Sequence, residues 1–284
     1  MPVPSWTSAR WRPSPFLQLS AVVHLVAAAG VLLAPAQWPW WLGALAVNHG
    51  LITAAGLLPR CHWLGPNLTR LPPSAAARGE VALTFDDGPD PAVTPRVLDL
   101  LDQAGMRATF FCIGERVLAH PALAREIVRR GHHIENHTQH HPHGFSLYGP
   151  RRMAREVEQA QCTLAQASGR APRYVRAVAG LRNLFLQPIL ARHGLKLVAW
   201  TRRGYDTRDA DPARVLARLS HQMAAGDILL LHDGHAGRTA EGQPLVLAVL
   251  PSLLTTLRGR GLRSVTLDAA CAPAAAPALQ GVPA

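Results

Sequence analysis

The chain opens with two apolar segments. Residues 16–34 contain no charged side chain, and at about 1.5 Å per residue such a segment is long enough to cross roughly 30 Å of hydrocarbon. After a break rich in proline, residues 40–58 are again uncharged, although Asn48 and His49 interrupt their apolar character. The pattern predicts two transmembrane helices joined as a hairpin, and hence a membrane anchor over residues 1–60.

The ends of the two segments bear on this interpretation. The second segment opens with Trp40 and Trp41 and closes at Arg60, and both residue types are common at membrane interfaces. A cleaved signal peptide is the alternative, because residues 34–36 (Ala-Pro-Ala) are similar to a small-residue cleavage site. The apolar region before them is longer than that of most signal peptides, so we favour an anchor.

Arginines flank the two segments, whereas the short loop between them carries none. The flanking residues are Arg10, Arg12, Arg60, Arg70 and Arg78. Positive charge is enriched on the cytoplasmic side of membrane proteins. The distribution therefore predicts a multi-pass protein of a bacterial-type inner membrane with its main domain in the cytoplasm. If only the first segment crosses, the domain faces outward instead.

From Glu80 onward, short β-like runs alternate with helix-like runs. The expected strands are 81–85, 108–113, a segment near 134, 174–178, 195–201, 228–231 and a segment near 265. The expected helices are 91–104, one that ends at 130, 150–167, 184–193, 212–225 and 245–258. About seven such units predict an α/β domain over 80–268 with a parallel sheet, either open or rolled into a barrel.

The segments on either side of this domain differ from it in composition. Residues 61–79 contain the pairs Gly65-Pro66 and Pro72-Pro73 and show no clear periodic pattern. This segment predicts a linker. Residues 269–284 are rich in alanine and proline, and this composition predicts a disordered tail.

The composition is at once apolar and basic. Hydrophobic residues make up 48% of the chain, charged residues 17%, and the formal net charge is +11. This balance suits a protein beside an anionic membrane surface, although a preference for arginine codons would give the same result, since Lys196 is the only lysine. The arginines are scattered, without an aromatic-rich basic stripe, so we expect no nucleic acid as a partner.

The cysteines add no chemistry to this picture. They are widely spaced and include no Cys-x-x-Cys pair: Cys61, Cys112, Cys162 and Cys271. Neither a disulfide framework nor a thiolate metal site is indicated.

Two adjacent carboxylates follow the first strand of the predicted domain. The strand at 81–85 ends in Asp86 and Asp87, followed by Gly88 and Pro89. Functional residues of barrels gather at the carboxyl ends of strands, and burying two neighbouring carboxylates is costly unless a cation neutralises at least one. An ordinary Asp-Gly-Pro turn that caps a helix is the alternative.

A histidine-rich segment follows a second strand end. His137 and His141 lie four residues apart, and in a helical turn they would share a face and present two nitrogens to one metal ion. With one carboxylate they would form a His₂Asp set that leaves positions open for water, as in catalytic sites. A solvated loop is the alternative, because other histidines crowd the same region.

A third strand end carries His232, directly after four apolar residues at 228–231. A histidine in this position can act as a proton donor. A structural histidine with a satisfied hydrogen bond is the alternative.

In this order, the segments 84–89 (Thr-Phe-Asp-Asp-Gly-Pro) and 137–141 (His-Thr-x-x-His) resemble the polysaccharide deacetylase family, the NodB-like catalytic domain of carbohydrate esterase family four. The resemblance covers about residues 80–268. It implies a distorted (β/α) barrel with fewer than eight full units and the use of zinc or a similar divalent metal ion.

The resemblance also implies roles for single residues. Asp87, His137 and His141 match the family's metal ligands, Asp86 matches the base that deprotonates water, and His232 matches the acid.

Further positions match supporting residues of the family. Thr138 matches the Ser/Thr of the histidine motif, Arg176 matches an arginine that holds the base, and Asp206 matches the aspartate that orients the acidic histidine. Leu230 matches a leucine that lines the acyl pocket, and the backbone donor to the oxyanion falls at Ala179.

Two segments depart from the family pattern. The family's Arg-x-Pro-aromatic segment is replaced by residues 176–179 (Arg-Ala-Val-Ala), which lack both the proline and the ring. A backbone donor survives such a change, but the loop loses the rigidity that a proline gives. The segment 200–207 also has an aspartate without a tryptophan after it, which bears on the walls of the substrate groove.

These features predict a metal-dependent hydrolase that removes an N-acyl group, expected to be acetyl, from an amino sugar in a polysaccharide or a lipid-linked glycan. A metal-containing sugar-binding or scaffold protein of weak activity is the alternative. The pair of Asp86 and His232 favours the enzyme, because binding alone requires neither a base nor an acid.

Overall fold

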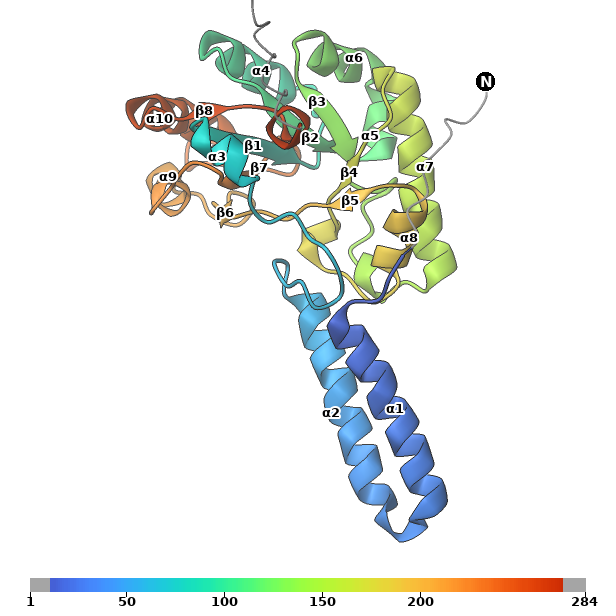
Figure 1. Ribbon diagram of the computed structural model, residues 1–284. Coiled ribbons are helices and arrows are strands. Elements are labelled where there is room, and N and C mark those ends of the chain that lie inside the picture. The colour runs from blue at the N-terminus through green and yellow to red at the C-terminus, as the bar shows by residue number, and fades with distance from the viewer. Residues whose placement is uncertain (1–10, 273–284) are drawn as a thin grey trace, which may run out of the picture.

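The computed structural model describes residues 11–272. The first ten residues of the predicted anchor, with Arg10, and residues 273–284 of the predicted tail lie outside the described residues. A helical hairpin extends from one side of an α/β domain (Figure 1).

The domain is built on a curled sheet of seven parallel strands, an incomplete barrel. Their order across the sheet is β5-β4-β3-β2-β1-β7-β6. The strands are β1 (Glu80–Asp86), β2 (Ala108–Cys112), β3 (His133–Asn136), β4 (Tyr174–Val175), β5 (Lys196–Leu197), β6 (Arg202–Arg203) and β7 (Ile228–His232). A further short strand, β8 (Arg263–Ser264), pairs with the start of β1. The predicted parallel α/β sheet is confirmed.

The central strands are buried on both faces, as expected for a parallel sheet covered by helices. Successive side chains point to opposite faces, so Leu83 and Phe85 of β1 join the large core beneath α4 and α10, while Ala82 joins a separate cluster on the other face. The parallel register sets Asp86 directly beside His232 of β7. The sheet thus brings two of the predicted functional residues together.

Helices surround the sheet (Figure 1). They are α3 (Pro73–Ala77), α4 (Thr94–Gln103), α5 (Gly114–Ala119), α6 (Pro121–Arg129), α7 (Pro150–Ser168), α8 (Leu186–Arg192), α9 (Pro212–Ser220), α10 (Leu245–Gly259) and α11 (Leu267–Cys271). Short 3₁₀ turns occur at Pro35–Gln37, Phe145–Leu147 and Val178–Gly180. The helix expected to run to residue 130 is divided at His120, because Pro121 disfavours the helical conformation of the residue before it.

One predicted strand is wrong as a single element. Residues 195–201 contain only β5, which pairs with β4 at one edge of the sheet. The chain then crosses to the opposite edge, where β6 pairs with β7. The segment must leave its first neighbour to reach its second, so the ladder is interrupted and Trp200 packs on Leu230 instead.

The regions predicted as linker and tail contain some regular structure. Helix α3 lies within 61–79, and Ala75 in it is fully buried. Helix α11 includes the first residues of the predicted tail, and Ala270 is buried in it.

The hairpin consists of α1 (Pro15–Leu33) and α2 (Trp38–Leu57), which pack against each other. The polar residues that interrupt the second apolar segment face α1: the amide of Asn48 donates to the hydroxyl of Ser20 at 2.9 Å, and the rings of His49 and His24 contact at 3.2 Å between their Nε2 atoms. Apolar side chains such as Leu32, which is 82% exposed, point outward.

Of the two hairpin helices, only α1 is long and apolar enough to be a membrane span by length and composition, with a mean hydropathy of 2.1. Helix α2 has a similar length but does not meet this criterion. It therefore does not support the expectation of a multi-pass protein. One N-terminal apolar helix, a span or a signal anchor, is what the described residues support.

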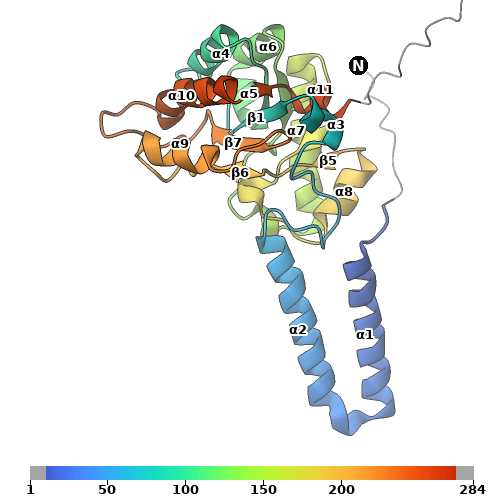
Figure 2. The ribbon, with the colours of Figure 1, turned by 60° about the vertical axis from the view of Figure 1, so that its left-hand side comes forward.

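The end of α2 rests directly on the domain (Figure 2). The backbone N–H of Arg182 donates to the carbonyl of Gly56 at 3.0 Å, and the side chain of Asn67 donates to the carbonyl of Pro59 at 2.8 Å. A Cβ atom on Gly56 would lie 2.3 Å from the carbonyl oxygen of Arg182. Only glycine allows so close a backbone approach.

This contact makes a prediction about Gly56. Replacing it with alanine forces the backbones apart, at a cost of about 1–3 kcal/mol in unfolding free energy, and lowers the melting temperature of the full-length protein in detergent micelles. Gly50→Ala, in the same helix, is the matched control, because no atom of the described residues lies within 4 Å of its Cβ position. Equal melting temperatures for the two variants would contradict the docked position of α2.

Candidate active site

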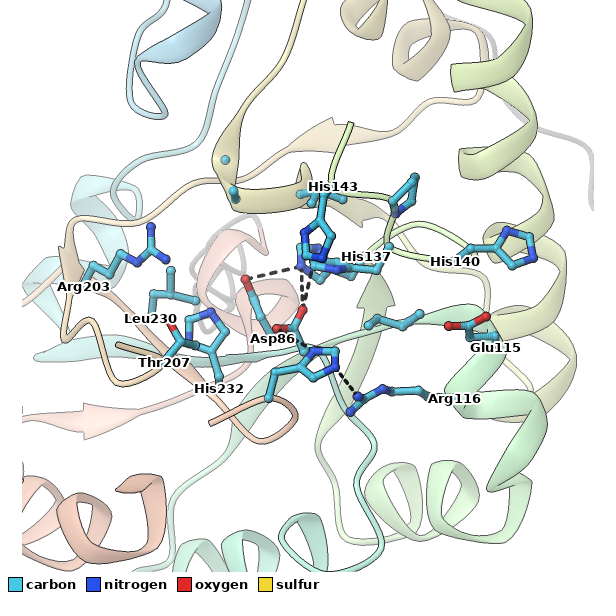
Figure 3. A pocket seen from close by; sticks show the side chains of 18 of the residues that line it. Asp86, Glu115, Arg116, His137, His140, His143, Arg203, Thr207, Leu230 and His232 are labelled. Atoms are coloured by element: carbon cyan, nitrogen blue, oxygen red, sulfur yellow. Dashed lines mark hydrogen bonds and ion pairs between the residues drawn. The ribbon is translucent and has the colours of Figure 1, made fainter. Parts of the chain in front are cut away.

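The carboxyl ends of the central strands gather the predicted functional residues. Asp86 ends β1, His232 ends β7, and His137 follows directly after β3. In a parallel sheet these ends lie at the same edge. Figure 3 shows Asp86 between His137 and His232 in one pocket.

Three side chains converge as a possible metal site. The Oδ1 atom of Asp87 lies 3.3 Å from Nε2 of His137 and 3.1 Å from Nε2 of His141. One ligand atom from each residue lies within 4.8 Å of the others. Two imidazole nitrogens and one carboxylate oxygen are a usual donor set of catalytic zinc sites.

The surroundings of Asp87 fit a cation. Its Oδ1 atom is buried and has no hydrogen-bond partner among the described residues. Burial alone would raise the pKa of Asp87, but its contacts with His137 and His235 hold that pKa well below its usual range. The carboxylate is therefore ionised and has an oxygen available for a positive charge.

A loop with unusual backbone angles presents the two histidines. Asp87, Thr138 and His141 have φ values of 70°, 67° and 50°, a region that costs energy for residues other than glycine. The hypothesis that a helical turn presents His137 and His141 is wrong, because this segment is a bend. The loop is fixed instead by Asn136, which accepts from the N–H of Thr138, and by the Thr138 hydroxyl, which accepts from the N–H of His141.

The tautomer of His137 follows from its hydrogen bond. Its Nδ1 atom lies 2.8 Å from the carbonyl oxygen of Arg176. Because a carbonyl can only accept, Nδ1 carries a proton, and Nε2 is the nitrogen that a neutral ring presents with its lone pair on the side of Asp87. This is the orientation that a metal ligand requires.

Asp86 is held by a fully buried arginine. Nη1 of Arg176 donates to Oδ1 of Asp86 at 2.6 Å and to the hydroxyl of Thr84 at 2.8 Å, while Nη2 donates to the carbonyl of Ala199 at 2.9 Å. The guanidinium also lies over the ring of Phe111, 4.1 Å from its centroid. These contacts fix the direction of the Asp86 carboxylate.

His232 is oriented by Asp206. Its Nδ1 atom lies 2.9 Å from Oδ1 of Asp206, and its backbone N–H donates to Oδ2 at 2.8 Å. Burial alone would lower the pKa of His232, but the Asp206 carboxylate and the carboxylates of Asp86 and Asp87 raise it above its ordinary value. The ring therefore favours its protonated form and turns Nε2 away from Asp206.

A cavity of about 630 Å³ opens over these residues. Leu230, Val178 and Trp200 form an apolar part of its wall, and Ala179 lines it at a φ of 53°. Thr138 is fully buried and does not line the cavity. It supports the histidine loop from behind and has no direct access to a bound molecule.

The cavity is also lined by polar residues that the sequence motifs did not identify. His235 places Nδ1 at 3.5 Å from Oδ2 of Asp87, and its Nε2 lies 2.7 Å from Nη2 of Arg116. Arg116 can only donate, so His235 carries its proton on Nδ1, toward Asp87. Its position three residues after His232 was the one signal in the sequence. Arg116 lies on α5, and only the fold brings it here.

Several known proteins are similar to this chain in sequence. The sequence model described as polysaccharide deacetylase matches residues 74–198. A chitooligosaccharide deacetylase of Sinorhizobium fredii is 36% identical over 203 residues, which cover 68% of this chain and 93% of that protein. A peptidoglycan-N-acetylglucosamine deacetylase of Bacillus cereus is 34% identical over 191 residues, covering 66% of this chain and 86% of that protein.

Solved structures agree with these matches. A family 4 carbohydrate esterase from Streptomyces lividans, in complex with acetate, has a TM-score of 0.59 and 34% sequence identity, and the match covers 66% of this chain and 91% of that one. By sequence and by fold, this chain belongs to the polysaccharide deacetylase family.

Proposed function

We propose that this chain hydrolyses the acetamide of N-acetylglucosamine residues in a glycan. The relatives named above are deacetylases of chitooligosaccharide and of peptidoglycan N-acetylglucosamine. The observation that carries the proposal is the single cavity in which Asp87, His137 and His141 converge, with Asp86 on one side and His232 on the other.

A divalent cation, which we propose to be zinc, fits this donor set. Asp87, His137 and His141 would hold it, and the unpartnered Oδ1 atom of Asp87 supports its presence there. When bound, it would supply a Lewis acid that acidifies water and polarises the amide carbonyl.

The protein's own groups would move two protons. Asp86, aligned by Arg176, accepts a proton as water attacks the carbonyl carbon. His232, protonated and oriented by Asp206, donates a proton to the amine nitrogen as the carbon–nitrogen bond breaks. The products are acetate and a free amino sugar.

The apolar wall suits the acetyl methyl group. Leu230 is 1% exposed and packs with Trp200 and Ala199, so a methyl group beside it loses its contact with water. The backbone N–H of Ala179, on the lining of the cavity, is the proposed donor to the developing oxyanion.

The alternative, a binding or scaffold protein of weak activity, has less support. Such a protein needs neither a base nor an acid, yet Asp86 and His232 both face the cavity and each has a dedicated buried partner, Arg176 and Asp206.

Two substitutions separate the roles of the adjacent carboxylates. Asp86→Asn should lower the rate of acetate release from chitooligosaccharide by about 10²-fold or more while zinc binding persists, whereas Asp87→Asn should lose both activity and bound zinc. Acetate release and metal analysis of the full-length protein measure the two effects.

Asp99→Asn is the matched control for these variants. Its carboxylate is on the outer face of α4 and pairs with Arg130, so activity and metal content should stay within about twofold of the unchanged protein. Full activity of the Asp86→Asn variant would refute the base, and full zinc content of the Asp87→Asn variant would refute the ligand.

We also propose that residues 1–60 anchor the catalytic domain, residues 80–268, to a membrane, with 61–79 as the connection. The exposed apolar side chains of α1 and α2 support this, and Asn48 is buried against α1, where its amide donates to the hydroxyl of Ser20. If both helices cross, the arginines at the domain end favour a cytoplasmic domain, and a cytoplasmic site would favour a lipid-linked glycan as substrate.

A reporter fused after Ala284 tests this topology. A cytoplasmic domain predicts fluorescence of a protein reporter that folds only in the cytoplasm, and no activity of a phosphatase that requires export. The opposite pattern would show that a single span carries the domain to the outer side.

A further inference from the structure

A second cavity adjoins the catalytic one at the base of the hairpin. It has a volume of about 620 Å³, and Trp200 and Arg203 line both cavities. On the hairpin side its wall includes Arg60 and Trp63. Figure 3 shows Arg203 beside Leu230 and His232, on the side of the pocket where the acetyl group is proposed to bind.

The wall of this second cavity is positively charged. Arg60 and Arg203 line it, and its described lining residues include no aspartate or glutamate. A guanidinium that is partly removed from water requires a compensating acceptor or negative charge. Arg60 is exposed and already donates to the carbonyl of Thr201, so this requirement applies to Arg203.

Arg203 is less accessible to water than Arg60. It is half-buried, its Nε atom is buried without a hydrogen-bond partner, and no carboxylate pairs with it among residues 11–272. Its guanidinium instead lies over the rings of Trp200 and Tyr205, at 5.2 and 5.1 Å from their centroids. The neighbouring Arg202, by contrast, pairs with Asp227 at 2.5 Å.

The position of the cavity indicates which anion it would take. Arg60 lies three residues after the end of α2, and its Nη1 atom donates to the carbonyl of Thr201 at 3.2 Å. Leu58 and Trp63, which are 59% and 50% exposed, line the same cavity. If the hairpin lies in a membrane, this cavity faces the headgroup region, where the link between a sugar and its lipid would lie.

We infer that the second cavity is a phosphate subsite. It would bind the phosphate group of an N-acetylated amino sugar through Arg203 and Arg60, while the acetamide of that sugar reaches the catalytic cavity across Trp200. Guanidinium groups suit this task, because their planar donors match phosphate oxygens in pairs. The inference rests on the proposed deacetylase function and specifies its substrate as a sugar phosphate.

The test compares three substrates with the full-length protein in detergent micelles. They are a neutral chitooligosaccharide, N-acetylglucosamine phosphorylated at its anomeric oxygen, and N-acetylglucosamine joined to a polyprenol through a diphosphate. For each one, kcat/KM for acetate release is measured with the unchanged protein and with Arg203→Gln.

The subsite predicts a difference between the substrates. Arg203→Gln should lower kcat/KM for the phosphorylated substrates by about tenfold more than for the neutral one, and Arg60→Gln should act in the same direction. Arg203→Lys, which keeps the charge, should restore part of the loss. If both phosphorylated substrates respond, the subsite recognises the phosphate itself. A response of the polyprenol compound alone means that it requires the lipid-linked diphosphate.

Arg96→Gln is the matched control, because it removes an exposed positive charge from α4, outside both cavities. It should leave the three values of kcat/KM unchanged, and thermal unfolding checks that every variant folds. An equal effect of Arg203→Gln on all three substrates, or no effect, overturns the subsite. A protein that releases acetate from none of the three would instead refute the proposed function.

Discussion

The site depends on burying two adjacent carboxylates at the end of one strand. Asp86 and Asp87 are both nearly inaccessible to water, and neighbouring charges of one sign repel strongly in such surroundings. The chain separates them: Asp86 keeps the strand direction and contacts Arg176, while Asp87, at a φ of 70°, contacts the two histidines. Each carboxylate thereby acquires different partners and a different chemical role.

Much of this arrangement could be predicted from the sequence, because parallel strands end at one edge. That rule alone predicts that Asp86, His137 and His232 lie close together. The same reasoning could not find the break between β5 and β6, since a continuous apolar run does not reveal that its ends pair with opposite edges of the sheet. Arg116 was equally hidden, because only the packing of α5 brings it to His235.

The loop that departs from the family pattern is also the loop on which the hairpin rests. A Cβ atom on Gly180 would lie 2.6 Å from the ring of Trp200 and 2.7 Å from Cβ of Pro59, and the N–H of Arg182 bonds to Gly56. The sequence lacks the family's proline and aromatic ring at 178 and 179, and contacts from the end of α2 enclose the loop instead. Pro59, directly after the apolar segment, is thus in contact with Gly180 in the wall of the catalytic cavity.

Crystals of the protein grown with zinc would test the central claim most directly, through anomalous diffraction at the zinc absorption edge. The account predicts one strong peak about 2.0–2.2 Å from a carboxylate oxygen of Asp87 and from Nε2 of His137 and His141. A peak elsewhere, with none among these three side chains, would contradict it.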